Sequence, residues 1–404
     1  MLGAVSSNSA SVWSRVAGEH DVSIRYSKSS NFTEFEETPS IRSLAENDYC
    51  VTQTIEGLTP GTYYHYQVLV DGIVHQVPNQ RGSDSLLTAP TESMQPRFNI
   101  AFGSGANTDE DGLQAIWLQV QNARPHAFFW LGEKDSAETA LPPAFQAEKY
   151  RQQRNVPFLQ PLLRAIPQIS AWDGAATPDA MDTFQRYWAN PEAAANTTYF
   201  TYNYAGVDFF FLDTSSYSDD ETTLLGANQL AWLKSELEQS NGKFKILLSS
   251  KSWTNAASDD SKNWLNYKAE RDGLFAFIGE EEIPGVMLIS GSDQQAEINA
   301  IPLSQDGHYD LYEMTSSPLA QTPASDYSYD DTSSISIQEP YADSMNFGLL
   351  SFDMTFEDPS VEFQIINVFG ESVFPEFQVH ASELSKGIAS WKSKQDPTSV
   401  AFTK

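Results

Sequence analysis

Short segments in which apolar and polar residues alternate fill the first part of the chain. The alternation is clearest over residues 11–16, 22–26, 49–55 and 63–70. Alternation with a period of two predicts strands that bury one face. Turn residues such as Pro60-Gly61 and Asp71-Gly72 separate these segments. Because short strands with regular turns are typical of antiparallel sandwiches, we expect a β-sandwich domain over residues 1–92.

One turn in this region has a more specific pattern. The segment from Gly57 to Tyr64 reads Gly-Leu-Thr-Pro-Gly-Thr-Tyr-Tyr. It resembles the turn before a late strand in fibronectin type III-like domains, which implies a fold and no function.

The only cysteine, Cys50, lies in an alternating run. We therefore expect a buried, inert side chain, and neither a disulfide framework nor a thiolate metal cluster.

A polar, proline-containing stretch over residues 88–96 predicts a linker, and the pattern changes after it. Continuous apolar runs typical of buried strands occupy residues 98–102, 127–131, 207–212, 244–248 and 286–289. Two segments between them, 112–122 and 228–238, have apolar residues at helical spacing. Strand patterns return over residues 347–354 and 361–368. This order predicts a layered α/β domain over residues 97–380, followed by a polar, loosely held tail over residues 381–404.

Composition narrows the classes of partner. The chain of 404 residues has 24 basic and 54 acidic residues, and its formal charge is −30. A field of this sign repels nucleic acids and anionic membranes, so neither is an expected partner. No segment approaches the roughly 20 apolar residues that span a bilayer. Such acidity is typical of a secreted protein, extracellular or periplasmic, although solubility explains it equally well. The chain begins within its first predicted strand, which we interpret as a mature protein whose signal peptide has been removed.

Several loops of the second domain carry familiar motifs. They are Phe102-Gly103-Ser104, Ala123-Arg124-Pro125, Trp130-Leu131-Gly132, Arg164-Ala165-Ile166-Pro167, Ala171-Trp172-Asp173, residues 207–214, Leu288-Ile289-Ser290-Gly291, residues 309–313 with Ser316-Ser317, and Asn346-Phe347-Gly348. In this order they resemble the PhoD-like alkaline phosphatases, a branch of the calcineurin-like metallophosphoesterases, over essentially the whole chain. The resemblance implies a four-layer αββα sandwich behind the N-terminal sandwich, with the site in the loops at the carboxyl ends of the strands.

The resemblance also identifies the positions at which the family binds two metal ions. Where the family has metal-binding residues, this chain has Gly105 after Phe-Gly-Ser, Glu133 after Leu-Gly, Gly174 and Ala175 after Trp-Asp, and Ser292 and Gln294 after the last glycine. Glycine and alanine offer no ligand atom, and glutamine offers a neutral carbonyl that binds transition metals poorly. None of the six histidines falls in these loops. We therefore expect no catalytic metal.

Some acidic residues remain in the same loops and leave an alternative open. Glu133, Asp135, Asp173 and Asp293 could form an oxygen-only calcium centre. Glu133 has a longer side chain than the aspartate it replaces, and a displacement near 1 Å is damaging for catalysis. Asp173 could equally cap its own loop. The run from Asn107 to Gly112 resembles half of a calcium loop, but it lacks the closing glutamate.

The sequence gives little support for other kinds of catalytic or binding site. There is no Gly-x-Ser-x-Gly elbow for a serine nucleophile. No pair of carboxylates stands out for glycoside hydrolysis. Arg271 is expected to be an ion-paired structural residue. The aromatic segments 199–204 and 253–267 could line a groove for an organic or carbohydrate ligand, and core packing explains them equally well.

Together these features predict a secreted phosphatase-fold protein that is a non-catalytic binding or assembly component with an extracellular ligand or protein partner. The alternative is a phosphomonoesterase or phosphodiesterase with an atypical, calcium-dependent centre.

Overall fold

The structure, a computed structural model, describes most of the chain. The described residues are 1–75, 84–132, 142–174, 176–194, 197–218, 222–254, 263–291, 294–323 and 334–395, with Glu339 described by its backbone alone. Over these ranges, no helix has the length and apolar character needed to cross a bilayer.

The first domain is an antiparallel β-sandwich, as predicted. One sheet contains β1 (Leu2–Val5), β2 (Ser9–Arg15) and β6 (Cys50–Glu56). The other is built around β3 (Asp21–Ser27) and β7 (Tyr63–Val70), with the short strands β4 (Glu36–Glu37), β5 (Ile41–Arg42), β8 (Ile73–Val74) and β9 (Asp84–Leu87). Residues such as Val12, Ile24 and Tyr66 fill the core between the sheets. Cys50 is buried and free, which confirms the prediction, and burial raises the pKa of its thiol to about 11.

The second domain contains two facing sheets, and their strand orders place the site. The first sheet runs β12 (Gln168–Ser170), β11 (Ala127–Trp130), β10 (Arg97–Gly103), β20 (Asn346–Asp353), β21 (Ser360–Asn367), β22 (Phe377–His380). The second runs β13 (Phe200–Tyr204), β14 (Val207–Phe211), β15 (Phe244–Ser249), β16 (Val286–Ser290), β18 (Leu311–Thr315), β17 (Ala296–Ile301), β19 (Ile335–Tyr341). Strands β10, β11 and β12 are parallel, as are β14, β15, β16 and β18. Their carboxyl ends therefore meet at one edge.

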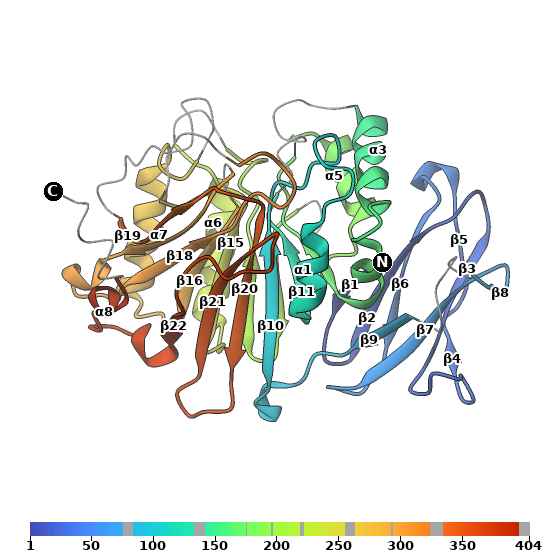
Figure 1. Cartoon of the computed structure of the whole chain (residues 1–404), viewed down its shortest axis with the longest axis horizontal. Coiled ribbons are helices and arrows are strands. Elements are labelled where there is room, and N and C mark those ends of the chain that lie inside the picture. The colour runs from blue at the N-terminus through green and yellow to red at the C-terminus, as the bar shows by residue number, and fades with distance from the viewer. Residues whose placement is uncertain are drawn as a thin grey trace.

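Helices cover the outer faces of both sheets (Figure 1). On the side of the first sheet lie α1 (Ile116–Ala123), α3 (Pro143–Arg154), α4 (Gln160–Ala165) and α5 (Pro178–Tyr187). On the side of the second lie α6 (Gly226–Gln239) and α7 (Lys268–Glu280). An apolar core that includes Phe129 and Phe211, with ring centroids 5.0 Å apart, fills the space between the sheets. The expected four-layer αββα architecture is confirmed.

Helix α1 begins later than the apolar spacing predicts, at Ile116 rather than at residue 112. The Oδ1 atom of Asp111 accepts the amides of Leu113 and Gln114, both at 2.9 Å, and Gln114 has a φ of +51°. The chain therefore makes a capped turn before the helix. Asn107 is used in the same way, since its Oδ1 atom accepts the amide of Asp109 at 2.8 Å. Asn107 and Asp111 thus hold their own loop, whereas Asp109 pairs with Lys149 of α3 and Glu110 accepts the amide of Thr322 at 2.9 Å.

The expectation of a loosely held tail is wrong for residues 381–395. The carboxylate of Asp310 accepts the amides of Ser390 at 2.7 Å and Trp391 at 3.1 Å. The ammonium of Lys394 pairs with Glu383 at 2.8 Å. The contacts with Asp310 and the packing of Trp391 against the main core involve the body of the domain, so the polar composition of the tail does not reveal them.

Candidate functional site

The loops after the parallel strands converge at one edge of the two sheets, and we call this region the mouth. It comprises residues 103–107, 131–132, 171–174, 212–216, 249–252, 290–291 and 315–321. Backbone bonds join the loops, for example from the amide of Leu319 to the carbonyl of Ser104 at 2.8 Å. The two sheets approach each other at Gly291, where a Cβ atom would lie 2.4 Å from the carbonyl oxygen of Leu131. The mouth is therefore the place at which the sequence predicted a site.

Not all predicted site positions can be located. Gly105, Asp173, Gly174 and Gln294 are among the described residues. Glu133, Asp135, Ala175, Ser292 and Asp293 lie outside them. Gly105 and Asp173 approach the same glycine, since the amide of Gly105 lies 3.4 Å from the carbonyl of Gly132 and a Cβ atom on Gly132 would lie 2.5 Å from Asp173 Oδ2. Gln294 has a φ of +74° in the turn that leads to β17.

At position 174, an aromatic ring fills the space that a side chain would need. A Cβ atom on Gly174 would lie 2.3 Å from the Cη2 atom of Trp172. This indole is buried, its Nε1 atom donates to Ser216 Oγ at 2.6 Å, and its ring packs edge-on against Phe184 with centroids 5.0 Å apart. The ring is thus held on two sides, and a ligand side chain could not enter at position 174 without displacing it.

At Gly105, two polar side chains point at the space that a ligand side chain would take. A Cβ atom there would lie 2.8 Å from Gln321 Oε1 and 3.3 Å from Ser317 Oγ. Both side chains are buried, and neither of these oxygens has a hydrogen-bond partner within the described part of the chain. Gly105 also has a φ of +69°, a conformation that disfavours any residue with a side chain.

The carboxylate of Asp173 is held by serine hydroxyls. Its Oδ1 atom accepts from Ser250 Oγ at 2.9 Å and from Ser215 Oγ at 3.2 Å. Burial raises the pKa of the Asp173 carboxyl, and the positive charge of Lys251 together with both serine hydrogen bonds opposes that rise. The nearest partners of Asp173 come from the loops after β14 and β15.

A second aspartate, Asp213, anchors the loop after β14. It is fully buried and accepts the amides of Ser215 at 2.9 Å and Ser216 at 2.8 Å, together with the hydroxyl of Thr198. Burial raises the pKa of the Asp213 carboxyl, and these hydrogen bonds oppose the rise. The same loop presents Ser215 to Asp173 and Ser216 to Trp172. Asp213 therefore positions the residues that line the mouth.

The described residues of the mouth do not fit a binuclear metal centre. Such a centre needs several carboxylates and imidazoles that converge on two cations. No group of three or more histidine, cysteine, aspartate or glutamate side chains placed to hold a metal occurs within the described ranges. All six histidines are described, and none belongs to the mouth. Of the nearby carboxylates, Asp213 accepts hydroxyl and amide donors at both oxygens, and Asp173 accepts two serine hydroxyls at Oδ1.

Below the mouth, the fully buried Glu313 ties strands together. Its carboxylate accepts from Ser252 Oγ at 3.1 Å, the amide of Trp253 at 2.8 Å and Ser290 Oγ at 2.5 Å, and also from the hydroxyl of Thr254. Arg271 is structural, as predicted, because it is buried, donates to the carbonyl of Trp253 at 2.7 Å and pairs with Asp272 at 2.9 Å.

The aromatic segments pack in the core over their described parts. Trp253 stacks on Trp264 with centroids 4.0 Å apart, and Tyr202 and Tyr204 are buried.

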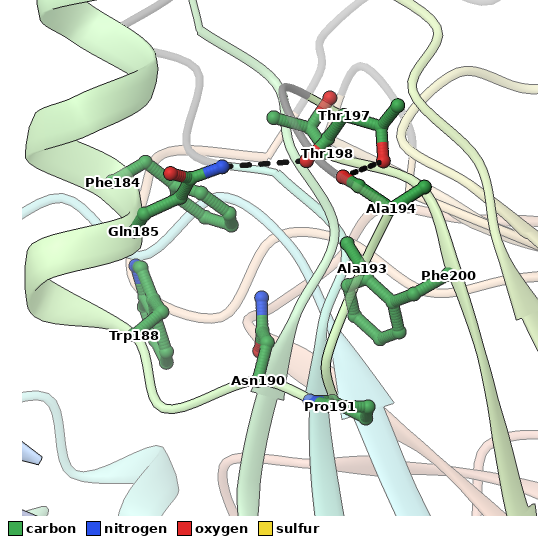
Figure 2. Close-up of a pocket in the computed structure, with 10 residues that line it drawn as sticks. All are labelled: Phe184, Gln185, Trp188, Asn190, Pro191, Ala193, Ala194, Thr197, Thr198 and Phe200. Atoms are coloured by element: carbon green, nitrogen blue, oxygen red, sulfur yellow. Dashed lines mark hydrogen bonds between the residues drawn. The ribbon is translucent and has the colours of Figure 1, made fainter.

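A pocket of about 290 Å³ lies beside the mouth, next to α5 (Figure 2). It is lined by Phe184, Gln185, Trp188, Asn190, Pro191, Ala193, Ala194, Thr197, Thr198 and Phe200. Phe184 and Thr198 also contact Trp172 and Asp213, so these side chains separate the pocket from the mouth.

Sequence reasoning missed most of the residues that shape the mouth. Ser215, Ser250 and Lys251 follow predicted strands directly, so the rule that sites form at the carboxyl ends of parallel strands would have found them. Ser317 belongs to one of the motifs that carry the resemblance, but only the folded chain brings its oxygen and that of Gln321 to Gly105.

Family models match both domains of the chain. A model described as PhoD-like phosphatase matches residues 180–363, and one described as PhoD-like phosphatase, N-terminal domain, matches residues 1–83. A solved structure of PhoD is 15% identical with a TM-score of 0.73, over 96% of this chain and 91% of that one. Purple acid phosphatase PPD1 from yellow lupin (Lupinus luteus) seeds is 12% identical with a TM-score of 0.68, over 94% and 73% of the two chains. At these identities the structures show a shared fold. No curated protein sequence matches the chain.

Proposed function

The chain belongs to the PhoD-like phosphatase family, and we propose that it is a non-catalytic member whose mouth binds a ligand or partner instead of hydrolysing a phosphoric ester. In the family, the metal ions polarise the ester and activate water, and this chemistry depends on a converging set of ligands. The proposal is that this chain has lost that set.

The observation that carries the proposal is the position of the Trp172 indole. The resemblance places a family ligand at Gly174, and a Cβ atom there would lie 2.3 Å from the indole. A lost ligand alone could be compensated by a neighbouring side chain. A space that is filled by a buried, hydrogen-bonded ring cannot, since interiors are close-packed and yield little. The positive charge of Lys251 also disfavours a metal ion at this position, because it repels a cation that approaches Asp173.

Metal analysis together with phosphatase assays tests this proposal. The protein should be purified without chelator and analysed for iron, zinc, manganese and calcium by inductively coupled plasma mass spectrometry. We expect substoichiometric metal, and no turnover of p-nitrophenyl phosphate or bis-p-nitrophenyl phosphate above that of protein-free buffer across pH 5–10. Stoichiometric iron, zinc or manganese with turnover would overturn the proposal.

The same assays in excess calcium address an oxygen-only centre. Of the four acids that the sequence suggests for such a centre, Asp173 is the one that the structure describes, and two serine hydroxyls already occupy its Oδ1 atom. Calcium-dependent turnover that is lost in Glu133→Ala would replace the proposal by an atypical esterase.

We further infer that the protein acts outside the cytoplasm. A formal charge of −30 keeps a protein soluble in surroundings rich in salt and divalent ions, and the single, buried cysteine is compatible with an oxidising compartment. Fractionation of the native source followed by immunoblotting tests this. Recovery in the cytosolic fraction alone would contradict it.

A further inference from the structure

We propose that the mouth binds adjacent hydroxyl groups of a neutral carbohydrate. This inference rests on the proposed non-catalytic function and names the class of ligand for the same site. Three open polar groups carry it. They are a carboxylate oxygen, an ammonium group and a pair of buried oxygens, and each comes from a different loop.

The first open group is the second oxygen of Asp173. Its Oδ1 atom accepts two serine hydroxyls, whereas Oδ2 accepts no hydrogen bond from any described residue. A Cβ atom on residue 132 would lie 2.5 Å from Oδ2, so the glycine at this position lets the carboxylate pack closely against the backbone there. The serine bonds fix the orientation of the carboxylate. Oδ2 is therefore a fixed acceptor that lacks a donor.

The second open group is the ammonium of Lys251. Its backbone is held on both sides by Ser249, whose hydroxyl donates to the carbonyl of Lys251 at 2.6 Å and accepts its amide at 3.0 Å. The side chain forms no ion pair or hydrogen bond with the described residues, and it is partly exposed. The charge of Lys251 acts on Asp173 without a direct ion pair between them. Lys251 directly follows Ser250, whose hydroxyl bonds to Asp173 Oδ1 at 2.9 Å, so the loop that holds this carboxylate also carries the ammonium group.

The third open feature is the pair of oxygens beside Gly105. Ser317 Oγ and Gln321 Oε1 are buried and unpartnered over the described ranges. A single point, the position of the missing Cβ atom, lies within 3.3 Å of both. Gly105 is hydrogen-bonded to Gly132, against which Asp173 packs, so these two oxygens and the Asp173 carboxylate lie beside two bonded glycines. A buried polar group without a hydrogen-bond partner lowers the stability of the fold, and a ligand that hydrogen-bonds to such a group gains affinity.

The chemistry of these groups selects the class of ligand. Asp173 Oδ2 and Gln321 Oε1 are acceptors, Lys251 is a donor, and the hydroxyl of Ser317 can act as either. A phosphate group in its dianionic form has only acceptors, so it would leave both open acceptors without a donor and would face the negative charge of Asp173. A hydroxyl group both donates and accepts. Neighbouring hydroxyls on a sugar ring can each donate to one of these acceptors or accept from the donor, and the opposite charges of Asp173 and Lys251 favour a neutral ring.

Glycan binding by the full chain tests the inference. The protein should be screened on an array of neutral glycans built from glucose, galactose, mannose, xylose and N-acetylglucosamine, and the best glycan measured by calorimetry. Inorganic phosphate and p-nitrophenyl phosphate serve as the anionic probes. We expect neutral glycans to bind and to be weakened roughly tenfold or more by Asp173→Asn and by Lys251→Met, because each substitution removes a hydrogen bond to a charged group.

Ser317→Ala separates a binding role from a structural one. Because the Ser317 hydroxyl has no partner among the described residues, its loss should leave the melting temperature unchanged while glycan binding weakens. Matched controls are Asp358→Asn and Lys386→Met. Asp358 also accepts a serine hydroxyl, from Ser382 at 2.7 Å, but it lies near the start of β21, at the sheet edge away from the mouth. Both controls should bind glycans as the wild type does.

Three outcomes would overturn the inference. They are the absence of glycan binding, glycan binding that survives both Asp173→Asn and Lys251→Met, and phosphate that binds more tightly than every glycan. Failure here is distinct from failure of the proposed function. A metal-free, inactive protein that binds no glycan overturns this inference alone, whereas stoichiometric metal with turnover overturns the proposed function.

Discussion

At the scale of single residues, the backbone at position 174 packs directly against an indole. The missing side chain is what allows Trp172 to lie there, with its Nε1 atom on Ser216 and its ring against Phe184. The glycine and the ring therefore depend on each other. A single substitution that restores a carboxylate would have to move a buried aromatic residue.

We expect Gly174→Asp to destabilise the protein by about 1–3 kcal/mol, the usual cost of overpacking, without metal uptake. Urea unfolding followed by tryptophan fluorescence measures the stability, and equilibrium dialysis with zinc and manganese measures the uptake. The matched control is Gly273→Ala in α7, where a Cβ atom meets nothing within 4 Å. It should stabilise the protein by about 0.4–1 kcal/mol. Stable metal binding by Gly174→Asp would contradict the proposed reason for the lost site.

At the scale of elements, the second sheet is joined to the loop after β15 by one buried carboxylate. Glu313 on β18 accepts hydrogen bonds from Ser290 at the end of β16 and from three consecutive residues of that loop, Ser252, Trp253 and Thr254. Thr254 also accepts from Asn299 on β17 at 2.8 Å. This network places Lys251 and Ser250 at the mouth, although it contains no residue that faces a ligand.

The substitution Glu313→Gln should cost about 3 kcal/mol, because it replaces an acceptor oxygen by a donor among buried donors. Chemical unfolding gives the stability. Glycan binding should weaken as well, since the loop that carries Lys251 loses its anchor. Glu362→Gln on β21, a partly exposed glutamate, is the control and should change the stability by less than about 0.5 kcal/mol. A stable Glu313→Gln variant would show that the network does not hold the loop.

At the scale of the whole molecule, the sandwich is anchored to the α/β domain through Asp48. Its carboxylate accepts from Arg15 at 2.9 Å within the sandwich, from Arg151 of α3 at 2.6 Å and from the hydroxyl of Tyr187 of α5. Beside it, the guanidinium of Arg154 lies 5.0 Å from the ring of Trp13 and 4.6 Å from that of Trp188. Such charge-assisted and cation–π contacts fix one domain against the other.

The stability of this interface should depend on pH. Burial alone would raise the pKa of Asp48, but hydrogen bonds from Arg15, Tyr187 and Arg151 outweigh it and lower the pKa from 3.8 to about 2. Because the pKa is lower in the folded state, the contribution of Asp48 is fully present above about pH 4 and is lost as the pH falls through 2.

The test is Asp48→Asn, which keeps the left-handed backbone at φ +48° acceptable. We expect a loss of about 2 kcal/mol at pH 7 that shrinks below pH 4 and nearly vanishes at pH 2. Unfolding curves of both proteins between pH 7 and pH 2 measure this difference, with Asp358→Asn as the control for a change in net charge. A difference that stays constant with pH would rule out the ion pair as its cause.

The sequence by itself determined the elements and the fold. Period-two alternation predicted β7 at residues 63–70, and continuous apolar runs predicted β10 and β15, because burial of one or both faces imposes these patterns locally. The absence of histidine from the mouth could also be read directly. Where a local cap competed with the apolar pattern, as at Asp111 before α1, the predicted boundary was wrong.

The tertiary structure alone decided what occupies the mouth. The partners of Asp173 are 42 and 77 residues away along the chain, and those of the Gly105 space are more than 200 residues away. No periodicity records such contacts, since they depend on how two sheets and their loops meet. Thus the residue types at positions 105 and 174 are a property of the sequence, whereas the indole beside Gly174 and the open oxygens beside Gly105 follow from packing.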